Sequence, residues 1–458
     1  MTQGTAVLSS DIEELGKRFA GPLLQPGAEG YEAARRVHNG MIDKRPGLIA
    51  QCSGVADIQQ AINFARGNSL EISIKGGGHN VAGRAVCDGG LTIDLSLMKG
   101  VLVDPKGRTV RAQGGVTWGE FNRETQVYGL ATTGGVVSTT GIAGLTLGGG
   151  LGWLMGKYGL AVDNLLSVQV VTADGEILHA SQNENSDLFW ALRGGGGNFG
   201  VAASFEYQLH QVGPTITGGL VVHAFDKAGD VLRFYRDFTA ALPDELSVFA
   251  GLLHAPDGSG NKIAAMLMCH CGTNEEASAA VQPAKEFGSP LMDVVGPMPY
   301  SDMNTLFDAG FPKGALNYWK SGFLRELSDD AIDTAVEEFG RCPSPMSGML
   351  LEHFHGAATG VPAEATAFPH RDPGFNLVVI SEWTNPSEND QNIAWAREAY
   401  DAMAPFTGSG RYVNYLGDVE EEDALAGAFG PNYARLRQVK KQYDPSNLFH
   451  LNQNIPPA

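Results

Sequence analysis

The sequence has few charged residues, and basic residues are especially few. Charged residues make up 18% of its 458 residues, below the ~25% of an average globular protein. Apolar residues reach 43%, which is enough to fill a core and argues against a disordered chain. Asp and Glu number 51 against 32 Lys and Arg, which gives a formal net charge of -19. Such a surface repels phosphate backbones, so we expect no nucleic-acid partner.

Long apolar runs and a cysteine framework are also lacking. No stretch reaches the ~18 continuous apolar residues of a membrane span, so we expect no membrane partner. The first residues contain no basic region followed by an apolar run, which favours a cytoplasmic protein. The five cysteines are an odd number and do not suggest a disulfide framework. Cys269-His270-Cys271 follows a strand-like run and has no second Cys/His pair at zinc spacing, so no metal site is expected.

Glycine is abundant and clustered. Its 60 residues are about 13% of the chain, against a usual ~7%. They gather at Gly76–Gly78, Gly148–Gly152 and Gly194–Gly200. Because glycine lets a backbone approach a ligand closely, several separate glycine loops suggest a large, flat ligand that carries phosphate.

The hydrophobic periodicity predicts a mixed chain of about two to three domains. Apolar residues from Val55 to Ala65 are spaced as on one helix face, with Ser53 as the expected cap. Strands are expected at 71–75, 91–96, 101–103, 109–112, 167–172, 176–180 and 201–209, and helices at 117–128, 187–193 and 433–443. Between about 213 and 410 helices such as Asp329–Phe339 alternate with strands such as Asn376–Ser381.

Common nucleotide motifs do not explain the glycines. Gly195–Gly200 matches GxGxxG, but an expected helix precedes it and a strand follows, the reverse of the dinucleotide-binding order. Gly156-Lys157 is followed by Tyr158, so it is not a P-loop. His79, directly after Gly76–Gly78, is the most informative position. Its loop could cradle phosphates with backbone amides, and its imidazole is a nucleophile when neutral.

Five ordered blocks resemble a known family. Lys75-Gly-Gly-Gly-His79-Asn80 resembles the flavin-linking loop of berberine-bridge-enzyme-like FAD oxidoreductases, within the vanillyl-alcohol-oxidase superfamily. The segments 148–164, 187–201, 412–415 and 445–456 are similar to further blocks of that family. The pattern of these blocks is similar to that of bacterial members of the family.

The resemblance implies a two-domain α+β fold with a PCMH-type FAD-binding domain. Residues 1–212 would form the N-terminal part of that domain, and residues 411–458 would return to it. Residues 213–410 would form a substrate domain whose antiparallel sheet covers the flavin ring.

The resemblance also implies covalent FAD, linked through His79 to the 8α-methyl carbon. Many members carry a second link from a cysteine eleven residues before the central triple glycine, but that position is Val137 here, so one link only is expected. Thr140 falls at the position that controls oxygen access. The FAD contacts implied are Lys75, Gly76, Gly77, Gly78, His79, Asn80, Thr140, Gly149, Gly150, Gly152, Tyr158, Asn198, Gly200, Val201, Tyr412, Asn414 and Asn452.

The resemblance places Tyr415 at the position of the catalytic base in several members of the family. A phenol has a pKa near ~10 and needs a nearby cation or donor that lowers it. Lys157, Arg371 and Arg411 are the candidate cations, and a packed strand aromatic is the alternative role for Tyr415. Glu352 and His353 are further catalytic candidates on opposite faces of an expected strand. Ordinary polar strand residues are the alternative for these two.

The resemblance implies an FAD-linked oxidase. It would take a hydride from a small organic substrate, such as an alcohol, an amine or a carbon of a secondary metabolite, and pass the electrons to O2 to give H2O2. A flavin dehydrogenase with another electron acceptor and a catalytically silent flavin- or small-molecule-binding protein are the alternatives. A singly linked flavin implies a rather closed site, which disfavours large oligosaccharides. The sequence identifies neither the substrate nor the oligomeric state.

Overall fold

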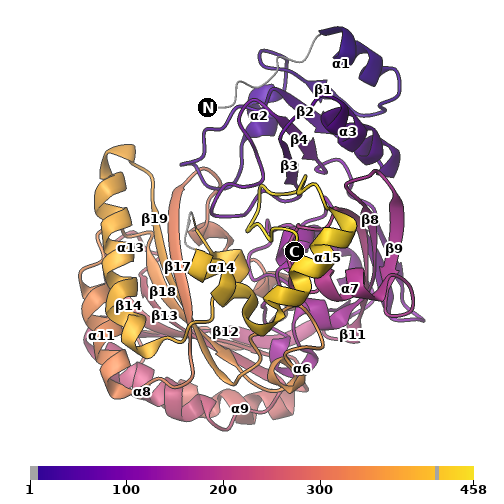
Figure 1. The fold of residues 1–458 in the computed structure, drawn as a ribbon. Helices are drawn as coiled ribbons and strands as arrows, with labels where there is room; N and C mark the ends of the chain where they lie inside the picture. Colours follow the sequence, from indigo (N-terminus) through magenta and orange to yellow (C-terminus); the bar gives the residue numbers. More distant parts are fainter. Residues whose placement is uncertain (1–8, 418–421) are drawn as a thin grey trace.

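The computed structural model describes residues 9–417 and 422–458. Two sheets lie in the N-terminal part of the chain and one large sheet in the middle. The last helices of the chain lie between them, as the yellow segment in Figure 1. This arrangement confirms the expected α+β fold with an antiparallel sheet in its middle part. None of the described helices is both long and apolar enough to cross a bilayer.

The first sheet contains four short strands in the order β1-β2-β4-β3. Strands β2, β4 and β3 are parallel, and β1 is antiparallel to β2. Its elements are α1 (Ser9–Gly16), β1 (Leu23–Leu24), α2 (Tyr31–Arg35), β2 (Leu48–Gln51), α3 (Val55–Gly67), β3 (Ile72–Lys75) and β4 (Leu91–Asp94). Helix α3 buries Ile58, Ile62 and Ala65 as the spacing predicted. The predicted cap is wrong: Gly54 occupies the N-cap, and the Ser53 backbone N–H before it donates to the Asp57 carboxylate.

The second sheet has five antiparallel strands in the order β5-β6-β10-β8-β9. Its elements are β5 (Val101–Asp104), β6 (Thr109–Gln113), α4 (Trp118–Gln126), α5 (Ile142–Leu147), α6 (Met155–Tyr158), η1 (Ala161–Asn164), β8 (Leu165–Val171), β9 (Ile177–Ser181), α7 (Ser186–Leu192) and β10 (Val201–Gln208). Strands β8 and β9 form a hairpin that turns at Asp174-Gly175. Gly175 has a φ of +79°, a conformation that would be strained for a residue with a side chain. Strands β7 (Leu130–Ala131) and β11 (His210–Gln211) form a separate pair.

The third sheet is antiparallel, with the strand order β15-β12-β14-β13-β18-β19-β17 and β16 beside β12. Its strands are β12 (Thr215–Ala224), β13 (Leu246–His254), β14 (Lys262–His270), β15 (Met292–Asp293), β16 (Gly296–Pro299), β17 (Leu316–Leu324), β18 (Gly348–Phe354) and β19 (Gly374–Trp383). Its helices are α8 (Ala228–Thr239), α9 (Asn274–Glu286), α10 (Tyr300–Met303), α11 (Asp329–Gly340), α12 (Ala357–Gly360) and α13 (Asn389–Met403).

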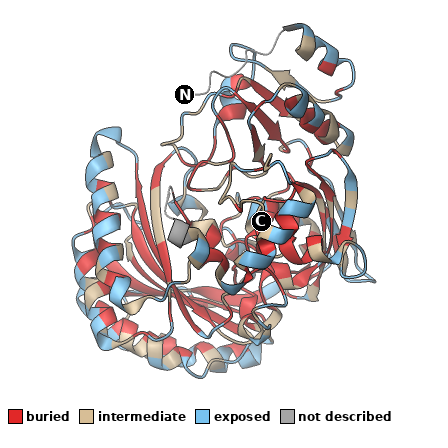
Figure 2. Ribbon diagram, viewed as in Figure 1, coloured by how far each residue is buried: buried red, intermediate tan, exposed pale blue. Residues whose placement is uncertain are grey.

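One face of this large sheet is covered by helices, and the other faces the N-terminal part. Helices α8, α9, α11 and α13 lie along the outer side in Figure 1. Side chains alternate between the two faces along β18. Met349 and Leu351 therefore point toward the helices, and Leu350 and Glu352 point to the inner face. Figure 2 shows the strands buried beneath helices whose outer surfaces are exposed. The inner face is therefore free to form the wall of a site.

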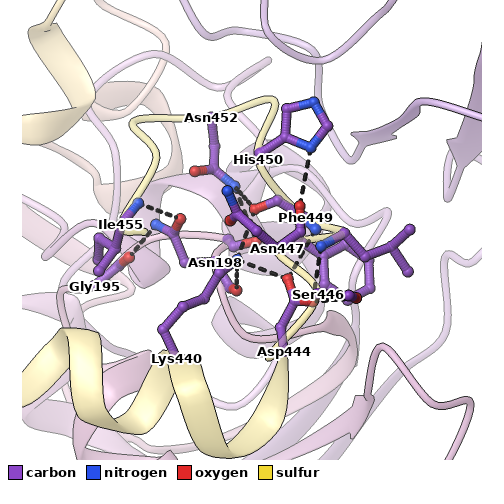
Figure 3. Close-up of polar contacts among 12 residues, drawn as sticks. Gly195, Asn198, Lys440, Asp444, Ser446, Asn447, Phe449, His450, Asn452 and Ile455 are labelled. Atoms are coloured by element: carbon purple, nitrogen blue, oxygen red, sulfur yellow. Dashed lines mark hydrogen bonds and ion pairs between the residues drawn. The ribbon is translucent and has the colours of Figure 1, made fainter. Parts of the chain in front are cut away.

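The C-terminal segment is tied to the glycine loop before β10. It contains the 3-10 turn η6 (Val413–Tyr415), α14 (Glu422–Phe429) and α15 (Tyr433–Tyr443). Tyr415 therefore lies in a turn, so the alternative of a packed strand aromatic is wrong in its secondary structure. In Figure 3, the Lys440 ammonium donates to the Asn198 carbonyl at 2.8 Å and to the Asp444 carboxylate at 2.7 Å. The Asn198 side chain accepts from the Ile455 N–H at 3.0 Å. These buried contacts join the C-terminal segment to the glycine loop before β10. The domain boundaries at 212 and 410 stay predictions.

Candidate active site

A cavity of about 280 Å³ lies where the glycine loops of the N-terminal part meet the inner face of the large sheet. Twelve of the site residues expected from the sequence line it: Gly76, Gly77, Gly78, His79, Asn80, Thr140, Gly200, Glu352, Tyr412, Asn414, Tyr415 and Asn452. They come from positions far apart in the chain, so the fold brings most of the expected site together.

The loop after β3 forms one wall because its glycines permit close backbone contact. A Cβ on Gly77 would collide with the backbone of Gly141. Gly78 has a φ of +67°, which reverses the chain toward His79. Lys75 does not line this wall, because its ammonium donates to the Ala34 carbonyl.

The His79 imidazole is neutral at physiological pH. Burial, followed by the nearby His38 and Lys313, lowers its pKa to about 3. Its ring stacks on His38 with 3.8 Å between centroids. Its Nε2 lies 2.8 Å from the Thr139 hydroxyl oxygen. A neutral, fixed imidazole at a cavity wall has the properties of a nucleophile.

The opposite rim of the glycine wall comes from the C-terminal segment. The Asn414 amide donates to the Leu145 carbonyl at 3.0 Å and to the Tyr412 hydroxyl at 2.8 Å. The Asn452 amide donates to the Gly197 carbonyl at 3.1 Å. These bonds fix the two asparagines against the glycine loops.

Several features of this wall fit the expected FAD. Within the described residues, the buried Asn452 Oδ1 and Arg84 Nε have no hydrogen-bond partner, and both residues line the cavity. A buried polar atom without a partner is costly, so a ligand with polar groups would satisfy it. A Cβ on the cavity-lining Gly197 would meet no protein atom, as expected where a ligand takes the space. The guanidinium of Arg84 suits a pyrophosphate.

The other residues expected to bind the cofactor are not among the residues that line the cavity, and their neighbours are protein atoms. A Cβ on Gly149 would clash with Phe368, one on Gly150 with Ala161, and one on Gly152 with the Gly134 carbonyl. Three further residues are of this kind. Tyr158 stacks on His210, and Asn198 binds the C-terminal segment. Val201, at the start of β10, packs against the core residues of the first sheet. Backbone packing by itself accounts for these glycines, and the FAD contacts expected of them stay predictions.

Glu352 and Tyr415 meet on the side of the large sheet. The Tyr415 hydroxyl donates to Oε1 of Glu352 at 3.0 Å, and the Asn376 amide donates to Oε2 at 2.6 Å. Burial raises the pKa of Glu352 to about 7, although both hydrogen bonds act to lower it. Burial and the nearby Glu352 charge raise the pKa of Tyr415 well above its usual value. The carboxylate is therefore the group that gains a proton near neutral pH.

The candidate cations do not contact Tyr415. Lys157 pairs with Glu245 at 3.3 Å, and Arg371 forms a bidentate pair with Asp163 at 2.7 Å. Arg411 donates to the carbonyls of its own turn at Gly408 and Gly410. The expected lowering of the phenol pKa by a cation is thus absent from this geometry.

His353 lies on the other face of β18 from Glu352. Its ring contacts His355 and Phe375, with centroid distances of 4.8 and 5.2 Å. It is not among the residues that line the cavity. The strand alternation was correct, and the structure shows which of its two faces meets the site.

Sequence reasoning missed the apolar part of the wall. On the side of the large sheet this part consists of Phe249, Phe307, Phe311, Trp319, Leu350, Val378 and Ile380. Leu350 and Glu352 are two residues apart in one strand, and so are Val378 and Ile380. This spacing was a usable signal. It indicates a shared face but not what that face contacts.

The chain is similar to known flavoproteins over almost its full length. Residues 46–181 match the family described as FAD binding domain, and residues 411–456 match the family described as berberine and berberine like. The (R)-6-hydroxynicotine oxidase of Paenarthrobacter nicotinovorans is 32% identical over 456 residues, which covers 95% of this chain and 97% of that protein. An FAD-linked oxidoreductase of Dictyostelium discoideum is 28% identical and covers 97% of each chain.

Solved structures agree with this likeness. The crystal structure of 6-hydroxy-D-nicotine oxidase from Arthrobacter nicotinovorans superposes with a TM-score of 0.88 at 29% identity, covering 96% of this chain and 98% of that one. A chitooligosaccharide oxidase shares the fold with a TM-score of 0.86 at 24% identity, covering 98% of this chain and all of that one.

Proposed function

Because the chain belongs to the berberine-bridge-enzyme-like FAD-linked oxidoreductases, we propose that it is an oxidase of a small organic substrate with Glu352 as its catalytic base. The observation that carries this proposal is the position of Glu352, which lies in the same cavity as the Gly76–Asn80 loop. Its pKa of about 7 is suited to proton transfer near neutral pH. An FAD-dependent oxidoreductase is the class to which its relatives belong.

The wall residues have separate roles in this proposal. Bound FAD would supply the hydride acceptor between the glycine loops and the sheet. Glu352 takes the proton from the substrate O–H or N–H next to the carbon that is oxidised. Tyr415 and Asn376 orient the carboxylate through their hydrogen bonds. The Tyr415 hydroxyl also favours the ionised carboxylate, which is the form that accepts a proton.

The overall reaction balances without another reactant. The substrate loses a hydride from carbon and a proton from the adjacent oxygen or nitrogen, and a C=O or C=N bond forms. The two electrons and two protons reduce one O2 to H2O2. Thr140 lies on the cavity wall, and we assign it a part in oxygen access.

FAD is covalently bound through His79 alone in this proposal. The support is that His79 lies on the cavity wall as a neutral imidazole. Val137 also lines the cavity, at the position expected for a second linking cysteine. Lys75 contributes through the backbone of the loop, and Arg84 binds the pyrophosphate.

Two measurements test the proposal. The purified protein is precipitated with acid: flavin in the pellet supports covalent attachment, and flavin that washes out entirely contradicts it. Anaerobic mixing with candidate alcohols and amines, followed by admission of O2, is then monitored by flavin absorbance and peroxide formation. If the flavin is reduced and then reoxidised slowly without peroxide, the protein is a dehydrogenase. If none of these compounds reduces the flavin, the result favours a catalytically silent binding protein.

A further inference from the structure

The part of the cavity formed by the large sheet and by the segment before β17 is almost entirely hydrocarbon. Its walls are the seven apolar residues named above, together with the Glu352–Tyr415 pair. Register explains why they meet. Leu350 lies opposite Val378, and Trp319 lies opposite Ile380, so their side chains project from the same face of neighbouring strands.

The aromatic rings form two groups, each held by ring contacts. Trp319 meets Phe311 and Tyr415 edge to face, with centroid distances of 5.8 and 5.7 Å. Phe249 and Phe307 both stack on the buried Trp153, at 4.7 and 5.9 Å. Rings that support one another in this way present fixed surfaces, and flat ligands pack well on such surfaces.

The polar donors in this region are already engaged. The Trp319 indole N–H donates to the Asn317 side chain at 3.0 Å. The Tyr415 hydroxyl donates to Glu352. An ionised carboxylate has room for about four hydrogen bonds, and Glu352 receives two from protein. The sheet wall therefore offers an acceptor at Glu352 to a ligand that brings a donor.

These observations lead to a substrate class, and the inference rests on the proposed function. We infer that the substrate is a flat aromatic molecule that packs among Phe249, Phe311 and Trp319 and presents one O–H or N–H donor to Glu352. A sugar would lose hydrogen bonds to water for most of its hydroxyls, because the hydrocarbon wall cannot replace them. An aromatic ring has no such groups to satisfy, and its burial is favourable.

The test uses equilibrium dialysis of the flavin-loaded protein without oxygen, with three probes. We expect 2-naphthol to bind about tenfold more tightly than 2-methoxynaphthalene, which keeps the rings and lacks the donor. Cellobiose should bind at least about a hundredfold more weakly than 2-naphthol. Cellobiose that binds as tightly as 2-naphthol would overturn the inference.

Variants locate the binding. Trp319→Leu should weaken 2-naphthol binding about tenfold, since it removes an aromatic surface. Phe234→Leu is the matched control and should leave the affinity for 2-naphthol unchanged. Phe234 lies on the outer helix α8, where its ring stacks on Phe287. Glu352→Gln should abolish most of the preference for 2-naphthol over its methyl ether. Equal affinities in the Trp319 and Phe234 variants would place the ligand elsewhere and refute the inference.

Failure of this inference can be separated from failure of the proposed function. Flavin content, and reoxidation by O2 after dithionite reduction, are measured on the same samples. If the probes bind as expected but no aromatic alcohol or amine reduces the flavin, the oxidase proposal is refuted and the ligand class is supported. If sugars reduce the flavin and aromatic compounds do not, the oxidase proposal stands and the aromatic class is refuted.

Discussion

The hydroxyl of Tyr415 donates a hydrogen bond of 3.0 Å to Oε1 of Glu352, between a 3-10 turn near the C-terminus and a strand of the large sheet. This relationship decides which of the two is the better base. The phenol is a donor whose pKa is raised, and the carboxylate is an acceptor whose pKa is about 7. We therefore assign the proton transfer to Glu352 and a positioning role to Tyr415.

The first prediction concerns the chemical step. Glu352→Gln keeps the shape of the side chain but removes the base, so the rate of flavin reduction should fall about 10²–10⁴-fold. Tyr415→Phe should cost no more than about tenfold, because it removes one orienting hydrogen bond. Stopped-flow reduction without oxygen measures both rates, and flavin content and melting temperature serve as controls. The opposite ranking of the two variants would return the base to Tyr415.

The second prediction is the pH dependence of that step. Glu352 accepts a proton only when ionised, so flavin reduction should rise with pH through an apparent pKa of about 7. The hydrogen bond from Tyr415 lowers this pKa. In Tyr415→Phe the rise should therefore shift to higher pH. Reduction rates between pH 5.5 and 9 test the shift, and an unchanged midpoint in the variant would contradict this coupling.

The third prediction concerns attachment of the flavin. His79→Ala removes the nucleophile, so the acid-precipitated protein should contain no flavin, while the native protein binds FAD without a covalent bond. Thr139→Val removes the hydrogen bond at Nε2, and should slow covalent incorporation into apoprotein without abolishing it. Acid precipitation followed by peptide mass spectrometry checks both. Covalent flavin in His79→Ala, or a flavin–cysteine peptide, refutes the assignment.

The fourth prediction separates two glycines of the same loop. A Cβ on Gly197 meets no protein atom, whereas Gly200 has a φ of +150° and a Cβ there would lie 2.5 Å from Val170. Gly197→Val should therefore fold with a near-normal melting temperature and bind much less FAD. Gly200→Val should be unstable or insoluble. Full flavin content in Gly197→Val would mean that the cofactor does not occupy this part of the cavity.

The fifth prediction concerns Glu382, at the end of β19. Among the described residues, neither of its buried carboxylate oxygens has a hydrogen-bond partner, and burial raises its pKa to about 8. An unfolded glutamate has a pKa of ~4.3. Between these values the folded state binds one more proton than the unfolded state, so stability falls as the pH rises through this window.

Glu382→Gln removes that titration. The variant should gain stability over the wild type on going from pH 5 to pH 8.5, by about 1–3 kcal/mol of the free energy of unfolding. Denaturant unfolding at the two pH values measures the gain. Glu326→Gln, at an exposed position, is the control and should show no such trend. A gain that is the same at both pH values would mean that the carboxyl does not titrate in this window.

The Gly76–His79 loop was recognisable in the sequence because its signal is local, and its contact with the cofactor stays a prediction. Three glycines before His79 are contiguous, and contiguous residues stay together in any fold. The same logic is less decisive at Gly149, Gly150 and Gly152, where an added Cβ would meet protein atoms. Glycine is required wherever two surfaces approach closely, and its presence does not reveal whether the second surface is a ligand or the chain itself.

The contact between Glu352 and Tyr415 was only partly predictable, for a related reason. Alternation separated Glu352 from His353, but it did not indicate which face meets the cavity. That depends on strand order, which places the helices on one side and the N-terminal part on the other. The apolar wall could not be assembled from the sequence, because Trp319 and Ile380 become neighbours only through the pairing of β17 with β19.

The connection between Asn198 and the C-terminal segment also bears on how the protein is made. Residues as late as Asn452 and Gln453 line the same cavity as Ile72, and the Lys440 contacts fix the late segment to the earlier glycine loop. On a ribosome, the wall of the cofactor site is therefore incomplete until almost the entire chain described here has been translated. Tight FAD loading should follow synthesis and release of this segment, and a nascent chain stalled before residue 440 should not retain the cofactor.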